Sequence, residues 1–151
     1  MTLILKQEPK NSSYTLPSKG FSRAVLYATE DLGIVETPFG DKHRCRLHFE
    51  VNERDTVGKR LFISKTYNVS LSEKSTLRKE LELWRGVKFN ADDLQAGINL
   101  EKLIGLNATI VVTHRETPDR VYANIENILP PQRNDKGKTD WYGLKPERSL
   151  R

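Results

Sequence analysis

The stretch NVSLSEKSTLRKELELWRG, from Asn68 to Gly86, decides the fold, because it predicts one substantial helix in a chain that otherwise reads as strands. Ser70 stands three residues before Glu73, the spacing of a capping box, so the helix is expected to begin there. Gly86 follows the last apolar residue and is a natural left-handed stop. The apolar side chains that recur at helical spacing are Leu77, Leu81 and Trp84.

Five segments around this helix alternate apolar and polar residues with the period of two that is typical of β-strands. The alternation is cleanest from His43 to Asn52, and Gly33 falls late in the first segment, where a strand can bend. Asn90 and Asn99 are placed to cap short helical turns after the helix. The expected strands span residues 21–36, 43–52, 60–69, 107–114 and 121–129.

The resulting order is three strands, one helix and two strands, which predicts an all-β protein with one main helix. Five strands can close into a Greek-key barrel, with the helix between strands three and four capping its open end. This is the layout of an OB-fold, which commonly binds oligonucleotides or oligosaccharides but also protein partners. We expect an OB-fold domain over residues 21–130, a flexible N-terminal arm over 1–20 and a disordered basic tail over 131–151.

Length and composition bound the class of protein. A chain of 151 residues normally forms one domain. No apolar run reaches the length of a membrane span, and the first residues turn polar too early for a signal peptide, so a cytoplasmic protein without membrane contact is expected. Cys45 is the single cysteine, which excludes an internal disulfide framework.

The net charge of +5 and the pI near 9.3 are compatible with an anionic partner, but the charge is uneven. From Pro130 to Arg151 there are six Lys or Arg and three Asp or Glu, a net of +3, which leaves +2 for the rest of the chain. Any basic surface on the predicted domain must therefore be local.

The strand at residues 43–52 predicts such a surface. If its apolar residues enter the core, Arg44, Arg46 and His48 must project from the opposite side. Arginine offers charge, forked hydrogen bonds and a flat group that stacks, so this row suits phosphates and unstacked bases. An ordinary solvated β surface carries similar residues, and this alternative stays open.

Aromatic and further basic residues extend the predicted surface. Tyr27, Phe62 and Tyr122 have the parity of outward residues and would stack bases, although one or two of them could belong to the core. Lys65 shares the parity of the apolar Ile63, so a bulge or an early end is expected in that strand. The basic residues that would extend the track are Arg23, Lys65, Arg115 and Arg120.

Other chemistry is not expected. His43 and Cys45 point to one side of a strand and His48 to the other, so they cannot share a metal ion. The chain has no phosphate-loop glycine pattern and no arrangement that indicates a catalytic nucleophile. We therefore expect no metal, no cofactor and no enzymatic activity.

Four stretches resemble a family of phage and prophage-type single-stranded DNA-binding proteins with an OB-fold. They are EDLGIVETPFGDKHRCRLHFEV (30–51), SKTYNVSLSEKSTLRKELELWRGVKF (64–89), INLEKLIGLNATIVVTH (98–114) and VYANIENILP (121–130). The resemblance covers roughly Phe21 to Pro130, and its motifs are mainly structural.

The resemblance implies sequence-independent coating of single-stranded DNA in replication or recombination, in a bacterial or phage-infected cell, with replication or recombination proteins as further partners. One departure is the C-terminus KPERSLR, because many bacterial single-strand binders end in an acidic tail with a terminal aromatic. The alternatives are an OB-fold protein-interaction module with an acidic partner and an RNA-binding protein. The oligomeric state, including a homo-oligomer, stays open.

Overall fold

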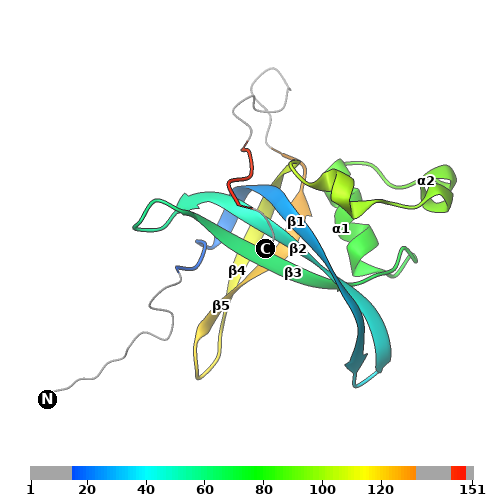
Figure 1. Cartoon of the computed structure of the whole chain (residues 1–151), viewed down its shortest axis with the longest axis horizontal. Helices are drawn as coiled ribbons and strands as arrows, with labels where there is room; N and C mark the ends of the chain where they lie inside the picture. The colour runs from blue at the N-terminus through cyan, green and yellow to red at the C-terminus, as the bar shows by residue number, and fades with distance from the viewer. Residues whose placement is uncertain (1–14, 132–143, 149–151) are drawn as a thin grey trace, which may run out of the picture.

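The computed structural model describes residues 15–131 and 144–148, which form one antiparallel sheet with a main helix beside it (Figure 1). An all-β protein with one main helix is thereby confirmed. In chain order the elements are β1 (Gly20–Thr37), β2 (Gly40–Arg54), β3 (Arg60–Asn68), α1 (Thr76–Arg85), α2 (Ala91–Ala96), the 3-10 helix η1 (Leu100–Leu103), β4 (Asn107–Glu116) and β5 (Val121–Leu129).

The five strands lie in the order β3-β2-β1-β4-β5, and each pair of neighbours is antiparallel. The outer strands β3 and β5 contact one another, but within the described residues no strand pairing joins them, so the sheet is not closed. The β1–β2 and β4–β5 hairpins extend beyond the body of the sheet, on opposite sides of the view in Figure 1.

The core lies between one face of the sheet and α1. The alternation expected along the second strand is confirmed, because Cys45, Leu47, Phe49 and Val51 are all buried. The helical residues Leu77, Leu81 and Trp84 are buried in the same cluster. The rings of Phe49 and Trp84 lie 5.6 Å apart, and the Trp84 indole donates a hydrogen bond to the Asn107 carbonyl at 2.8 Å.

The start of α1 differs from the prediction. The helix begins at Thr76 because the Ser75 hydroxyl caps it, accepting a hydrogen bond from the Arg78 amide at 3.1 Å. The same hydroxyl donates to the Ser70 carbonyl at 2.7 Å. The capping box of Ser70 and Glu73 was the wrong prediction, because the Ser70 hydroxyl accepts from the nearby Ser72 amide instead.

The end of α1 and the starts of the two short helices follow the predictions. Gly86 ends α1 with φ +83°, where its amide donates to the Glu82 carbonyl at 2.9 Å. Asn90 caps α2 in a capping box with Asp93, and Asn99 caps η1. In the described part of the chain no helix is long and apolar enough to span a membrane.

Two irregularities shape β1. Leu26 lies opposite Phe49 and Ala28 lies opposite His48, so Tyr27 is an extra residue at a β-bulge. This bulge changes the side to which the following residues project, so Ala28, which lies opposite His48, is not part of the core cluster that contains Leu26. The irregularity expected at Gly33 is confirmed, since its φ is +72° and the register shifts beside it.

Parts of both terminal segments contact the sheet. Ser18 donates to the Glu53 carboxylate through its amide at 3.0 Å and through its hydroxyl at 2.7 Å, so residues next to β1 are not a free arm. Residues 144–148 also lie on the sheet, contrary to the expected disorder of that stretch, because Leu144 is buried and charged neighbours pair with strand residues. The remaining predictions for both segments concern residues 1–14, 132–143 and 149–151, which lie outside the described residues.

Candidate nucleic-acid interface

The face of the sheet turned away from the core carries, at its centre, five of the ten predicted binding residues, namely Tyr27, Arg44, Arg46, His48 and Phe62. We call it the outer face, and it is built from side chains that lie opposite one another on β2 and β3, with Tyr27 of β1 beside His48. The cross-strand pairs on it are Arg44 with Asn68, Arg46 with Thr66, His48 with Ser64, and Glu50 with Phe62. The period of two along both strands places these side chains together.

Arg44 and Arg46 lie side by side along β2. The Arg44 Nε donates to Asn68 Oδ1 at 3.1 Å, and the Arg46 Nε donates to Thr66 Oγ1 at 3.0 Å. Both residues are half-buried, and these cross-strand bonds hold the guanidinium groups against β3. Each of these bonds uses only one of the N–H donors of its guanidinium group. The remaining donors of the two arginines are suited to bind an anion.

His48 lies on the outer face, as predicted, but it is only 8% exposed. Its Nδ1 is 2.6 Å from Ser64 Oγ and its Nε2 is 2.9 Å from Glu30 Oε1, so both ring nitrogens have protein partners. The Tyr27 ring lies 5.7 Å from the imidazole ring. His48 is therefore placed to support Tyr27 rather than to meet a ligand directly.

Tyr27 and Phe62 form the aromatic part of the outer face. Phe62 is 37% exposed, whereas Tyr27 is half-buried. Burial raises the pKa of the Tyr27 hydroxyl, and the nearby Arg148 opposes this effect. The Arg148 guanidinium lies 4.8 Å from the centre of the Phe62 ring and 5.6 Å from that of Tyr27, so both rings contact the same flat cation.

Glu50, Arg54 and Arg60 belong to the same face, although they were not among the predicted binding residues. Glu50 is fully buried, and its Oε1 accepts a hydrogen bond from Arg60 Nη1 at 3.3 Å. A buried carboxylate requires such partners, since an unpaired charge is costly to bury. The two-residue period could have identified these residues, because Arg54 continues the parity of Arg46 and Arg60 shares that of Phe62.

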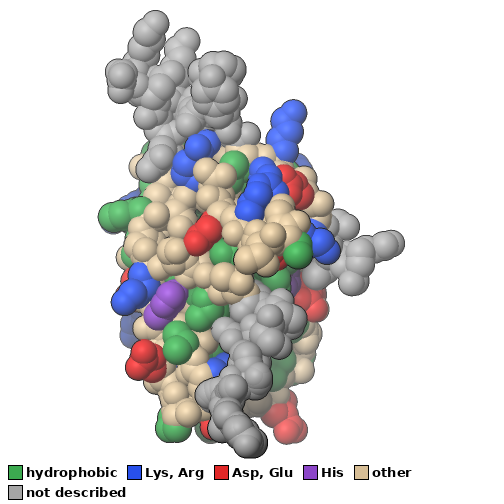
Figure 2. All heavy atoms as spheres, turned by 90° about the vertical axis from the view of Figure 1, so that its left-hand side faces the viewer, with side chains coloured by type: hydrophobic (Ala, Val, Ile, Leu, Met, Phe, Trp, Pro, Cys, Tyr) green, Lys and Arg blue, Asp and Glu red, His purple; other side chains and the backbone are tan. Residues whose placement is uncertain are grey.

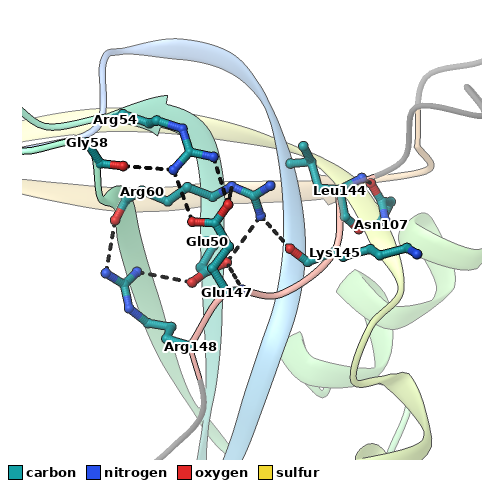
Figure 3. Close-up of polar contacts among 9 residues, drawn as sticks. All are labelled: Glu50, Arg54, Gly58, Arg60, Asn107, Leu144, Lys145, Glu147 and Arg148. Carbon is teal, nitrogen blue, oxygen red and sulfur yellow. Dashed lines mark hydrogen bonds and ion pairs between the residues drawn. The ribbon is translucent and has the colours of Figure 1, made fainter.

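Residues Leu144–Arg148, which we call the C-terminal segment, cover this part of the outer face (Figure 3). Asn107 fixes its start, with hydrogen bonds of 2.7 Å to the Leu144 amide and 2.9 Å to the Leu144 carbonyl. Arg60 Nη1 donates to the Lys145 carbonyl at 2.6 Å. No periodicity in LKPER indicates this contact, so the sequence alone could not have revealed it.

The other predicted residues lie apart from the centre of the outer face. Lys65 lies opposite Leu47 and its Nζ is 2.6 Å from Glu80 on α1, so it projects to the helix side without the expected bulge. Arg23 lies opposite Thr109 on β4, towards the start of β1. At the β4–β5 hairpin Tyr122 lies opposite Arg115, and the Arg120 guanidinium is 5.2 Å from the Tyr122 ring.

The three residues with metal-like spacing are separated. His43 Nε2 lies 2.7 Å from Asp31 Oδ1, and the Gly33 amide and His43 together lower the pKa of the Asp31 carboxyl. Cys45 is buried in the core, where burial raises the pKa of its thiol. Over the described residues no cluster of three metal-ligating side chains is found.

Charge is mixed on the surface that forms the left-hand side of the molecule in Figure 1. Figure 2 shows basic and acidic side chains interspersed on that side, without one continuous basic surface. On this side of the molecule the described residues therefore form no extended basic surface for an anionic ligand.

Comparison with known proteins adds no assignment, since no family model matches the sequence and no curated protein shows significant similarity.

Proposed function

We propose that this protein binds single-stranded DNA on its outer face, largely independently of sequence and without enzymatic activity. One observation carries the proposal: Tyr27 and Phe62 hold a flat guanidinium while Arg54 and Arg60 beside them hold a carboxylate. A nucleotide presents the same two chemistries, a flat base and an anionic phosphate, at close spacing. Arg44 and Arg46 would extend the phosphate track along β2.

The fold supports the proposal. The strand order β3-β2-β1-β4-β5, with α1 between β3 and β4, is the order of an OB-fold whose barrel would be completed by β3 and β5. OB-folds commonly bind oligonucleotides on the middle strands, which here carry the outer face. With the family resemblance, this favours a role in replication or recombination in the cytoplasm of a bacterial or phage-infected cell.

A protein-interaction module is the second candidate. The observation that favours it is the C-terminal segment, which is a peptide bound to the outer face through its backbone and side chains. A partner protein that presents neighbouring acidic and basic side chains, as Glu147 and Arg148 do, would fit there. RNA presents the same bases and phosphates as DNA, so RNA binding uses the same surface and is separated from DNA binding by experiment.

The test is a fluorescence titration of the full chain with oligo-dT, with an RNA and with a duplex, all of equal length. Tyr27 lies on the proposed surface, so base stacking should change the intrinsic fluorescence. We expect the tightest binding to oligo-dT. Equal binding to the duplex would contradict recognition of unstacked bases, tighter binding to RNA would reassign the ligand, and absence of any binding would favour the protein partner.

A further inference from the structure

The C-terminal segment places a carboxylate where the proposed function requires a phosphate. Arg54 donates two hydrogen bonds to the Glu147 carboxylate, from Nη1 to Oε1 at 3.0 Å and from Nη2 to Oε2 at 2.7 Å. Arg60 Nε adds a contact of 3.4 Å to Oε2. A forked arginine contact of this kind is suited equally to carboxylate and to phosphate oxygens.

Arg148 occupies the aromatic part of the face as a base would. Its flat guanidinium contacts the Tyr27 and Phe62 rings, and its Nη2 donates to the Arg60 carbonyl at 3.0 Å. Glu50 Oε2 lies 3.5 Å from Arg148 Nη1. A base stacked there would offer N–H donors of its own to the same carboxylate, since base edges carry amino and imino groups.

We propose that the C-terminal segment and single-stranded DNA compete for the outer face. When DNA binds, a phosphate replaces the Glu147 carboxylate on Arg54 and Arg60, and a base replaces Arg148 on the two rings. This inference rests on the proposed function and deepens it, because it assigns one phosphate and one base position and a built-in competitor. The net charge of the Glu147 and Arg148 pair is zero, so the competition arises from shape and local pairing rather than from overall charge.

The docked arrangement is suited to exchange. Glu50 Oε2, Arg60 Nε and Arg148 Nη1 are buried and have no hydrogen-bond partner among the described residues. Only longer ion-pair contacts reach them, 3.5 Å between Glu50 Oε2 and Arg148 Nη1 and 3.4 Å between Arg60 Nε and Glu147 Oε2. Incompletely satisfied buried groups weaken the docked state. Leu144 is held separately by Asn107, so the last residues of the segment can leave while its start remains attached.

The first experiment compares oligo-dT affinity of the full chain with that of the double variant Glu147→Ala and Arg148→Ala. The net charge is unchanged, so general electrostatics cannot explain a difference. If the C-terminal segment is undocked in about a tenth of the molecules, the variant should bind oligo-dT about tenfold more tightly. The matched control is Glu101→Ala with Lys102→Ala, a charge-neutral exposed pair on η1, which should keep the wild-type affinity.

The second experiment uses the unmodified chain, so it does not depend on the folding of a variant. The Glu147 amide donates to Glu50 Oε1 at 2.9 Å, and saturation with oligo-dT should accelerate its hydrogen exchange at least severalfold. DNA binding with unchanged exchange at Glu147, or with equal affinity in the folded double variant, would overturn the competition and leave the proposed function standing. No binding by either protein would overturn the proposed function itself.

Discussion

The Arg148 guanidinium lies 4.8 Å from the centre of the Phe62 ring, so a residue near the C-terminus stacks on the third strand of the sheet. Beneath it the fully buried Glu50 carboxylate supplies the opposite charge. The outer face thus already holds a flat group over an aromatic ring and an anion on two arginines. These are the two chemistries, a flat group and an anion, that a nucleotide would bring to the same face.

The row of arginines on β2 should matter for binding and little for folding. Replacing Arg44 and Arg46 together with alanine removes two half-buried cations whose cross-strand bonds are on the surface of the sheet. We expect stability to change by about 0.5 kcal/mol per site or less, and oligo-dT affinity to fall severalfold or more. Thermal unfolding and fluorescence titration of the same preparation measure both effects.

The control for this pair is Lys74→Ala with Lys79→Ala, which removes the same charge from exposed positions before and on α1. If both double variants lose affinity equally, the loss reflects net charge and the proposed face is wrong. Normal folding with wild-type affinity in the Arg44 and Arg46 variant would have the same consequence.

The core should respond in the opposite way. Phe49 is fully buried and its ring packs 5.6 Å from that of Trp84, so Phe49→Ala leaves a cavity between the sheet and α1. We expect a loss of about 3–5 kcal/mol in the free energy of unfolding, measured by denaturant titration. A loss below about 1 kcal/mol would show that the contact between sheet and helix is looser than described.

A buried polar contact joins β3 to α1. The Tyr67 hydroxyl donates to Glu80 Oε1 at 2.5 Å, and burial together with the Glu80 carboxylate raises the pKa of Tyr67. Tyr67→Phe removes the donor but keeps the ring, and should cost about 1.5–3 kcal/mol because the acceptor is charged. Denaturant unfolding checks this value, with Tyr122→Phe at the exposed hairpin as the control that should change nothing.

Docking of the C-terminal segment should depend on pH. The hydrogen bonds from Arg54, with the charges of Arg60 and Arg148, lower the pKa of Glu147 below its ordinary value of 4.5. A lowered carboxyl pKa contributes stability that is present above the ordinary value and is lost as pH falls through the lowered one. The segment should therefore be docked at neutral pH and released in acid.

The ring-proton NMR signals of Phe62 and Tyr27 should report this release, since both rings contact Arg148. Glu147→Gln is the control, because its amide has no charge to titrate and should weaken docking at neutral pH. Ring signals that respond to acid identically in the wild type and in Glu147→Gln would assign the transition to another group and contradict the role of Glu147.

Much of the fold was predictable because it follows from periodicity and from turn residues. The alternation around Leu47 and Phe49 placed β2 and its core side, and Gly86 marked the end of α1. The start of α1 was not predictable from spacing alone, because Ser70 and Ser75 both have suitable side chains. The Ser75 hydroxyl caps the helix and also bonds to the Ser70 carbonyl, a choice that depends on the path of the preceding chain.

The candidate site was only partly predictable. Arg46 and Phe62 follow from strand parity. Lys65 also keeps the parity of Ile63, and the bulge expected there is absent because its ammonium group pairs with Glu80, which lies on a different element. The docking of the C-terminal segment on the outer face could not be predicted for a related reason. Its contacts join Glu147 to Arg54 across most of the chain, and no local pattern records such a long-range ion pair.

The most direct test of the central claim is the salt dependence of oligo-dT binding by the full chain. If phosphates on the outer-face arginines provide the affinity, log K should fall linearly with log salt concentration by roughly 0.7 for each phosphate neutralised. We predict a slope that corresponds to several phosphates and becomes shallower in the variant with Arg44→Ala and Arg46→Ala. An affinity that is the same at low and moderate salt, or no binding of oligo-dT at any salt concentration, would contradict the account.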